Sequence, residues 1–325
     1  MNAWIALLVG FALTGAAQAQ VADDEGGPNE AVAPDSGSTD PGADGEEAGA
    51  VSFELGAGLE HDSNVAVLEL DASADAGDAA AAFELGVAYD RRGDAKLDFG
   101  AGYNFSETAH EDFAAFDVRI HRGSARMSYD FGRLDAGAML QHAVAELDGN
   151  EFLTLTQLSP YLSRLAGQRL FLRFALADTD KDFAGNPARD ASTSSLSSDA
   201  YVFLNGLTRY VVFGHRYDDE SAASAEFDYV GRRLSFQLSQ RFAMRAREIT
   251  LRTYLRAEDR DYRAVTPSIG ELRRDARREL EIVAEIPAGR RVLTRVGAKR
   301  ADNDSNLPAI DFAETVLSVG FSATL

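Results

Sequence analysis

Apolar and polar residues alternate with a period of two along most of the chain beyond residue 51. In SFELGAGLE the apolar positions, separated by serine, glutamate and glycine, are Phe53, Leu55, Ala57 and Leu59. AAFELGVAYD and AKLDFGAGYNF follow the same rule. Successive side chains of a β-strand point to opposite faces, so this pattern predicts strands with one apolar and one polar face. The segment 271–286 has some helical character, but its Leu280, Ile282 and Ile286 share one strand parity, which favours a strand.

We predict fourteen strands, an even number. They cover residues 51–61, 80–91, 94–106, 114–131, 133–147, 152–165, 168–182, 196–205, 207–219, 225–242, 246–262, 273–286, 290–303 and 312–325. Tight turns such as RRG, AGQ, NG and PAG alternate with longer polar loops after His61, Ser106, Leu147, Asp182, Glu220, Tyr262 and Asp302.

Tight turns at one end, long loops at the other and both termini on the tight-turn side are typical of an outer-membrane barrel. We therefore predict an all-β fold, a transmembrane antiparallel β-barrel of about 14 strands that occupies residues 51–325. Closure leaves no sheet edge exposed to lipid. The alternative is a soluble β-sandwich with one buried face per sheet, which would have to explain the consistently unequal loop lengths.

The last strand, ETVLSVGFSATL, has apolar residues at every second position. These residues are Leu317, Val319, Phe321, Ala323 and Leu325. We expect them to face lipid and the strand to pair with the first one. The strand resembles the C-terminal signal that outer-membrane barrels present to the barrel insertion machinery, although leucine stands where the last residue is commonly aromatic. The resemblance implies that this machinery is a partner of the chain.

The N-terminal segment is predicted to be a secretory signal peptide, residues 1–19. An apolar stretch over 4–13 is followed by Ala17, Gln18 and Ala19, a small-residue frame for cleavage before Gln20. The residues before Trp4 include no lysine or arginine, which departs from the usual pattern. The apolar stretch is too short to cross a bilayer of about 30 Å as a helix. We therefore expect export and a place in the outer membrane of a bacterium.

Residues 20–50 are predicted to form a disordered acidic leader, because they lack aromatic and basic residues and cannot bury enough apolar surface to order themselves. The whole chain has 52 acidic and 32 basic residues, a formal net charge of −20. This balance argues against a nucleic-acid partner, which needs a basic surface. The sequence contains no cysteine, so it has neither a disulfide framework nor a cysteine to carry a lipid anchor.

Charged residues on the polar face of three consecutive predicted strands are the candidate functional site. They are Arg252 and Arg256, then Glu279, Glu281 and Glu285, then Arg295 and Lys299. Basic, acidic and basic strands in sequence can pair across the sheet. Two interpretations stay open: a charged constriction that selects polar or ionic solutes, or a salt-bridged interior that stiffens the wall or closes a narrow lumen. Fourteen strands lie between small filled barrels and wide porins, so barrel size does not decide.

No set of residues predicts an enzyme, a cofactor or a metal site. The five histidines lack metal-type spacing, and no nucleophile elbow or phosphate loop is present. Ser63 beside His61 and Asp62 could form a triad at the barrel rim, but this is a minor alternative. DNDSN, residues 302–306, could bind calcium through oxygen ligands, yet such clusters more often form turns, and we predict a turn.

Three segments resemble a known family. GLEHDSNV, LDGNEFLTLTQLSPYLS and DSNLPAIDF look like parts of the barrel of the surface lipoprotein assembly modifier family and related tetratricopeptide-linked barrels. The resemblance spans most of residues 51–325. It implies a fourteen-stranded barrel that helps lipoproteins to reach the cell surface. The tetratricopeptide domain usual in that family has no counterpart in this sequence.

The sequence therefore predicts a porin-like channel or translocation pore for polar solutes. The alternative is a barrel that assists the surface export of lipoproteins or interacts with other molecules through its long loops. The expected partners are outer-membrane lipid and lipopolysaccharide, the barrel insertion machinery and, through the family resemblance, an exported lipoprotein.

Overall fold

The computed structural model describes residues 49–92, 96–244 and 247–325. The predicted signal peptide and nearly all of the predicted leader lie outside these residues. Among the described residues, no helix is long and apolar enough to cross a membrane.

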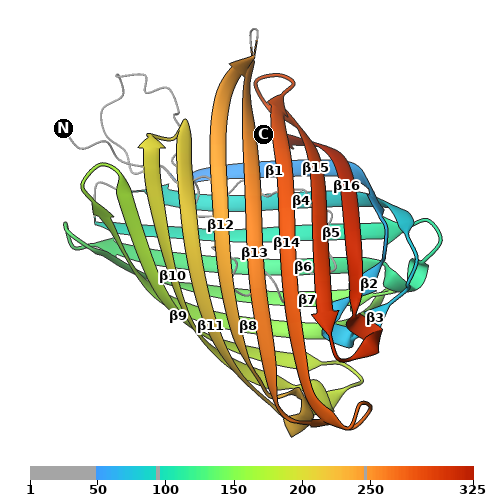
Figure 1. Ribbon diagram of the computed structural model, residues 1–325. Helices are drawn as coiled ribbons and strands as arrows, with labels where there is room; N and C mark the ends of the chain where they lie inside the picture. Colours follow the sequence, from blue (N-terminus) through green and yellow to red (C-terminus); the bar gives the residue numbers. More distant parts are fainter. Residues whose placement is uncertain (1–48, 93–95, 245–246) are drawn as a thin grey trace, which may run out of the picture.

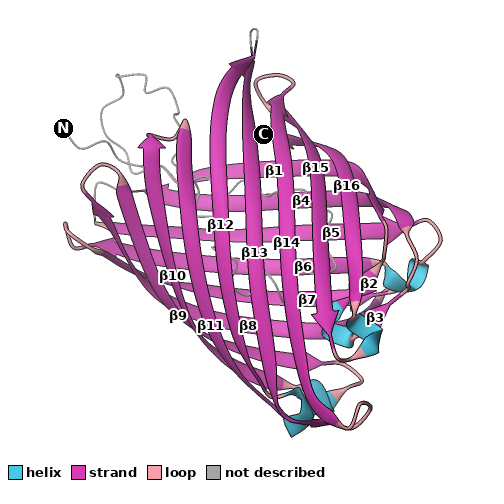
Figure 2. Ribbon diagram, in the orientation of Figure 1, coloured by secondary structure: helices cyan, strands magenta, loops and turns pink. Residues whose placement is uncertain are grey.

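Fourteen antiparallel strands form one closed barrel (Figures 1 and 2). The barrel strands are β1 (Ala50–Asp62), β4 (Asp78–Arg92), β5 (Leu97–His110), β6 (Val118–Asp130), β7 (Asp135–Leu147), β8 (Asn150–Ala166), β9 (Leu170–Phe183), β10 (Ala191–Asn205), β11 (Arg209–Ala222), β12 (Tyr229–Met244), β13 (Arg247–Thr266), β14 (Glu271–Pro287), β15 (Val292–Ser305) and β16 (Phe312–Thr324). Each strand pairs with its neighbour in the chain. The predicted fold class is confirmed.

The first and last barrel strands pair with each other and close the sheet. Ala57 lies opposite Phe321 in this pairing. The backbone N–H of Leu325 donates to the carbonyl oxygen of Phe53 at 2.9 Å, and the N–H of Phe53 donates back to Leu325 at 3.3 Å. The C-terminal strand is therefore fixed by β1, as the sequence predicted.

The strands are strongly tilted around the barrel. In Figure 1 the strands β12–β16 at the front run nearly crosswise to β4–β7 behind them. Tilts of about 35–45° to the barrel axis are usual for closed sheets, and they make opposite walls cross. Short turns join the strands at the end where both termini of the described chain lie. At the other end most connections are longer, above all 63–77, but β7–β8 and β13–β14 are joined by the short turns 148–149 and 267–270. The long loops predicted after Leu147 and Tyr262 are therefore wrong. By the rule for outer-membrane barrels, the short turns face the periplasm and the long loops face outward.

Four of the outer loops share one local structure. A single turn of 3-10 helix is followed by an aspartate: η2 (Ala114–Phe116), η3 (Pro187–Arg189), η4 (Ala225–Phe227) and η5 (Pro308–Ile310) precede Asp117, Asp190, Asp228 and Asp311. Each aspartate accepts a hydrogen bond from the backbone N–H near the end of the preceding strand, for example 2.7 Å from His110 to Asp117. The aspartate side chain thus accepts the backbone hydrogen bond that the neighbouring strand no longer accepts where the pairing of the strands ends.

This loop structure corrects three boundaries of our prediction. Strands were predicted to start at residues 114 and 225, but β6 and β12 start only after η2 and η4. The turn predicted at 302–306 is wrong as well, because β15 continues to Ser305. Asn303 and Ser305 are buried in the lumen while Asp302 and Asp304 are exposed, so the strand alternation simply continues with polar residues on both faces.

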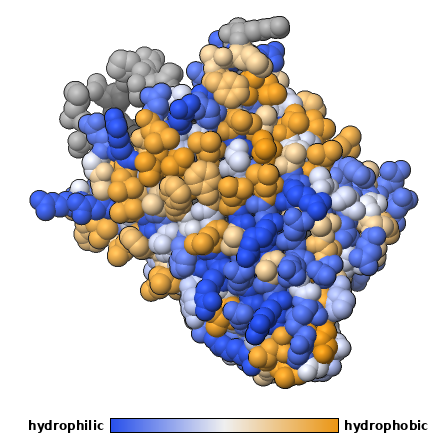
Figure 3. Space-filling model, in the orientation of Figure 1, coloured by the Kyte–Doolittle hydropathy of each residue, from blue (hydrophilic) through white to orange (hydrophobic). Residues whose placement is uncertain are grey.

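Large apolar side chains cover the outside of the barrel, and the polar side chains that alternate with them are buried inside. Of the predicted lipid-facing residues of β16, Leu317, Val319, Phe321 and Leu325 are 54%, 41%, 55% and 60% exposed, and Ala323 is half-buried. Figure 3 shows the apolar side chains gathered over the upper parts of the strands, with hydrophilic side chains over the lower parts. The barrel therefore has a lipid-facing band and extends beyond it on the side of the long loops.

Adjacent residues on β7 can test the two faces. Leu140 is 48% exposed on the outside, whereas Gln141 is half-buried and faces the lumen. We expect Leu140→Arg to lower the free energy of unfolding by about 2–4 kcal/mol, because the charge is placed in lipid. Gln141→Arg is the matched control and should fold like the wild type. Urea unfolding in lipid vesicles measures both, and equal losses would contradict the assignment of faces.

Candidate functional site

The seven predicted lumen residues all point into the barrel. Glu279, Glu281 and Glu285 on β14, like Arg295 and Lys299 on β15, are each less than a tenth exposed. Arg252 and Arg256 on β13 are partly exposed. The alternation of β13, β14 and β15 therefore places the predicted set on one stretch of the lumen wall.

Oppositely charged residues pair across these strands. A guanidinium nitrogen of Arg252 lies 2.7 Å from Glu285, and one of Arg256 lies 2.9 Å from Glu279. Glu285 also lies 3.6 Å from Arg295, its direct partner in the strand register. Lys299 differs from our expectation, because its ammonium group contacts Glu314 on β16 at 3.0 Å, although Glu281 is its partner in the register.

The charged network continues beyond the predicted strands. We call it the charged wall, the charged lumen residues of β11–β16 and β1. Glu258 lies between Arg233 at 2.7 Å and Arg260 at 2.5 Å. Glu314 is shared by Lys299 and Arg277, each at 3.0 Å. The sequence shows these residues at the correct parity, but only the register across β12–β16 brings those on different strands together.

The carboxylates of the charged wall are nearly all removed from water. A buried carboxylate is tolerated only when cations and hydrogen bonds replace its lost hydration. Glu258 and Glu314 each have two basic neighbours, which provides this compensation. The charged wall is therefore a packed, interlocked layer and not a row of free charges.

The opposite wall, formed by β4–β7, mixes small and charged lumen side chains. The small residues include Gly86, Gly100, Gly102, Ser124, Ser128 and Gly137, and the charged ones include Glu84, Asp90, Arg122 and Arg126, of which Arg126 pairs with Asp90. The lumen-facing Asn104 and Gln141 are only half-buried, unlike the carboxylates of β14. The side chains of Arg126 and Asp90 lie over Gly100, and the ring of Tyr161 lies over Gly137. The lumen is therefore polar on both sides, with the charged wall facing these strands.

A loop of the first hairpin lies across the outer mouth of the barrel. Residues 63–77 contain the two-stranded hairpin of β2 (Ala66–Val67) and β3 (Ala72–Ser73), joined by η1 (Leu68–Leu70). Val65 and Val67 are fully buried. Because the loop connects β1 and β4 but packs against distant strands, we call it the mouth loop.

Two arginines from distant parts of the barrel hold the mouth loop. Asp71 pairs with Arg189 of the β9–β10 loop and, at 2.9 Å, with Arg273 of β14. Arg189 also donates to the carbonyl oxygen of Glu69 at 2.7 Å, and its guanidinium lies over the ring of Phe227, 4.3 Å from the centroid. The β9–β10 loop lies diametrically opposite β1 and β4 in the strand order. These contacts therefore bridge the mouth from wall to wall.

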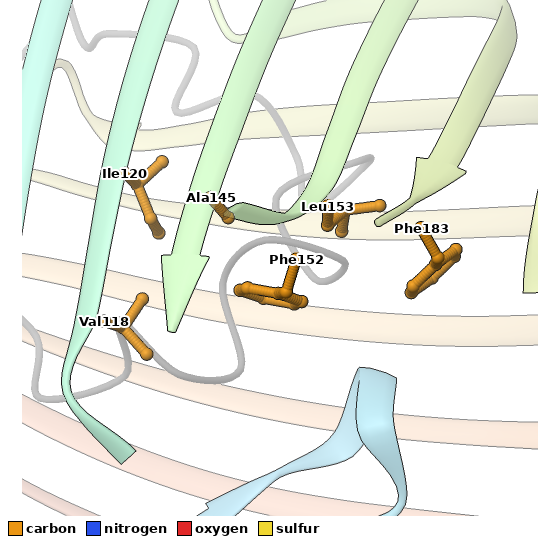
Figure 4. Packing of buried hydrophobic residues seen from close by; sticks show 6 residues of the cluster. All are labelled: Val118, Ile120, Ala145, Phe152, Leu153 and Phe183. Carbon is orange, nitrogen blue, oxygen red and sulfur yellow. The ribbon is translucent and has the colours of Figure 1, made fainter. Parts of the chain in front are cut away.

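An apolar cluster inside the barrel supports the same loop (Figure 4). It consists of Val118, Ile120, Ala145, Phe152, Leu153 and Phe183, with Leu70 of the mouth loop packed against it. These residues occupy lumen-facing positions near the outer ends of β6–β9, where a hydrated channel would need polar side chains. Their burial indicates a dry contact that closes this part of the mouth.

The residues considered for catalysis do not form a triad. His61 is exposed on the outer face, whereas Asp62 is buried on the inner face and accepts a hydrogen bond from the N–H of Asn64 at 2.9 Å. The hydroxyl of Ser63 accepts a hydrogen bond from the N–H of Thr315 at 2.8 Å. Strand alternation separates the neighbours to opposite sides of the wall. Within 49–92, 96–244 and 247–325, no three histidine or carboxylate side chains are placed to hold a metal ion.

A hollow of about 950 Å³ lies on the outer face of β9–β15. Apolar side chains such as Phe174, Phe213 and Leu234 line it, and each is more than half exposed. It lies on the outer face of the barrel and not in the lumen, and the paired Arg300 and Asp302 line it as well.

Known structures share this architecture. An anion-selective porin from Comamonas acidovorans aligns over 86% of this chain and 100% of its own, with a TM-score of 0.52 and 9% identity. Two further structures align with lower TM-scores. A bacterial polysaccharide outer-membrane secretin has a TM-score of 0.48 and 12% identity, and the alignment covers 84% of this chain and 97% of the secretin. OpdK of Pseudomonas aeruginosa with vanillate has a TM-score of 0.45 and 10% identity, and the alignment covers 85% of this chain and 99% of OpdK. No protein-family model and no curated protein matches the sequence.

The chain thus has the fold of an outer-membrane porin, a closed transmembrane β-barrel with fourteen strands. Its particular features are the charged wall and the mouth loop.

Removal of the Asp71 carboxylate should release the mouth loop. Because the chain has no cysteine, Val67→Cys places a single thiol in a fully buried position of this loop. We expect Asp71→Asn to speed labelling of that thiol by a membrane-impermeant maleimide about tenfold, since the loss of charged hydrogen bonds raises the open population. Asp75→Asn is the control, because Asp75 is exposed and bonds Ser73 within the same loop. Equal labelling in all variants would contradict the anchoring role.

The charged wall should fail when one carboxylate is removed. Glu314→Gln leaves Lys299 and Arg277 buried without their shared charge partner, and we expect the free energy of unfolding to fall by about 3–5 kcal/mol. Glu107→Gln is the control, because its pair with Arg119 lies on the exposed outer surface. That change should leave stability nearly unaltered. Equilibrium unfolding of both refolded variants makes the comparison, and equal stability would show that the wall does not depend on this pairing.

Proposed function

We propose that the protein is a passive, porin-like channel for polar solutes in the outer membrane, opened by movement of the mouth loop. The single observation that carries this proposal is the polar lumen, in which the charged wall faces polar and charged side chains of β4–β7, several of them only half-buried. A hydrated path lined by charged side chains lowers the barrier for polar solutes and keeps apolar ones out. Closure that depends on Asp71 is reversible, because ion pairs and small apolar contacts can separate and re-form.

In this proposal Arg252 and Arg256 contribute most directly to selectivity. Among the charged residues of β13–β15 that were predicted from sequence, these two are the more exposed to the lumen. Five more deeply buried residues set the electrostatic field behind these two arginines and hold them in position. They are Glu279, Glu281, Glu285, Arg295 and Lys299.

The outer entrance favours cationic over anionic solutes. The outer loops carry one basic residue, Arg189, in their described sequence. Their acidic residues are Glu69, Asp71, Asp75, Glu111, Asp112, Asp117, Asp148, Asp190, Glu226, Asp228 and Asp311. A rim of one sign concentrates solutes of the opposite sign at the mouth. The anion-selective neighbour therefore does not define the preference of this chain.

A second candidate is the export of lipoproteins, with an exported lipoprotein as partner. The resemblance to the surface lipoprotein assembly modifier barrel suggests it, and the covered outer mouth favours it, since an export module needs no permanent solute path. The long outer loops would then act as an interaction surface, with lipopolysaccharide as their surroundings. In both cases the outward residues of β16 are proposed to be recognised by the barrel insertion machinery before β16 pairs with β1.

Conductance in planar bilayers distinguishes the two candidates. We expect the refolded wild type to give discrete conductance steps, and Arg252→Ala with Arg256→Ala to shift selectivity further toward cations, because two lumen cations are lost. Arg232→Ala with Arg263→Ala is the control, since both arginines are exposed on the outer face. The measurement is the reversal potential in a salt gradient. A folded barrel that stays silent even with Asp71→Asn would refute the channel and favour export.

A further inference from the structure

Arginines surround the barrel at the end with the short turns. Each of the six turns at this end has at least one arginine in or beside it. These arginines are Arg91, Arg133, Arg164, Arg169, Arg209, Arg247, Arg290 and Arg291, and all are exposed. The outer loops, by contrast, are acidic. The charge distribution of the molecule is therefore polarised along the barrel axis.

Four of these arginines point outward to the lipid side of the barrel. Arg91 pairs in register with Phe99, and Arg247 with Met244; these partners are 43% and 55% exposed on the lipid face. Arg164 pairs with Leu172, and Arg209 lies two residues before Val211 on the same face. We call Arg91, Arg164, Arg209 and Arg247 the rim arginines. Their long side chains can keep the stem on apolar surface and the guanidinium in the headgroup layer.

The strand carboxylates that the structure describes at this end lie on the other side of the wall. In the part of the chain that the structure describes, the strand carboxylates near the short turns are Asp90, Asp98, Asp130, Asp135 and Glu248, all at lumen-facing positions. No described Asp or Glu shares the outward face with the rim arginines there. The separation of signs across the wall therefore gives the lipid side a positive collar.

The outward arginines at the opposite end have aspartate partners. Arg263 lies 2.7 Å from Asp219, Arg278 lies 2.7 Å from Asp259, and Arg300 lies 2.8 Å from Asp302. Arg232 lies 3.8 Å from Asp261. Aspartates on the same outer face thus balance these charges. Among the described residues, the outward arginines near the short turns share their face with no Asp or Glu, whereas those at the opposite end share their face with aspartates.

We propose that the rim arginines bind the headgroups of anionic phospholipids in the inner leaflet of the outer membrane. Guanidinium groups match phosphate oxygens in geometry, and each basic residue near an anionic membrane surface adds to the attraction. The side chains point sideways to the lipid, whereas an acidic periplasmic protein would contact the ends of the turns. The direction of the side chains therefore favours lipid as the partner. This binding fixes the depth of the barrel and does not depend on whether the lumen conducts.

Lipid retention by the full chain tests the proposal. The refolded barrel is titrated in detergent with phosphatidylglycerol or with phosphatidylcholine of the same acyl chains, and native mass spectrometry counts the bound lipids. We expect the wild type to prefer phosphatidylglycerol. Arg91→Gln, Arg164→Gln, Arg209→Gln and Arg247→Gln combined should weaken phosphatidylglycerol binding about tenfold or more. The matched control replaces Arg232, Arg263, Arg278 and Arg300 by glutamine and should bind as the wild type does.

Several outcomes would overturn the proposal. They are equal retention of the two lipids by the wild type, unchanged binding by the rim variant, and equal losses in the rim and control variants. Displacement of the lipid by glycerol phosphate at the same concentration would indicate a site for soluble phosphates instead. Heat-modifiable migration on gels confirms that each variant is folded. If the combined variant does not fold, Arg209→Gln and Arg247→Gln are measured singly, and the absence of any loss in both would refute the proposal.

Discussion

The hydrogen bonding of the backbone inside a bilayer is the constraint on which the rest of this structure depends. Lipid offers no partner to a free N–H or C=O group, so a membrane-spanning sheet has to close. Here closure depends on the pairing of β1 with β16, down to the two hydrogen bonds between Phe53 and Leu325. Once the sheet is closed, the alternation of side chains becomes a division between a lipid face and a lumen face.

That division explains how so many charges can be accommodated. On the lumen side, carboxylates and guanidinium groups of β11–β16 and β1 compensate each other, because most of them are buried away from water. On the lipid side, charges occur only beyond the apolar band. There they form arginine–aspartate pairs at the outer end and an arginine collar at the inner end. The same alternation thus builds a packed polar interior and an exterior that matches the layers of a membrane.

The mouth loop shows how local and distant interactions combine. Its hairpin is short and would not be stable alone, since two isolated strands have little to bury. It is held because Asp71 meets Arg189 and Arg273 and because Leu70 reaches the apolar cluster around Phe152. A few contacts of this kind leave the loop near the low end of local stability, where elements that open and close are usually found.

The sequence by itself determined the strands, their two faces and the pairing of the termini, because alternation and turn length are local properties of the chain. It also placed Arg252, Arg256 and the three glutamates of β14 on the lumen side. It missed the 3-10 turns before Asp117 and Asp228. In the sequence, an aspartate that accepts the last backbone hydrogen bond of a strand cannot be told from any other polar loop residue. Only the tertiary structure decided that Lys299 pairs with Glu314 and that Asp71 crosses the mouth to Arg189, 118 residues away. Such pairings depend on barrel closure and strand register, which bring together residues that no local pattern connects.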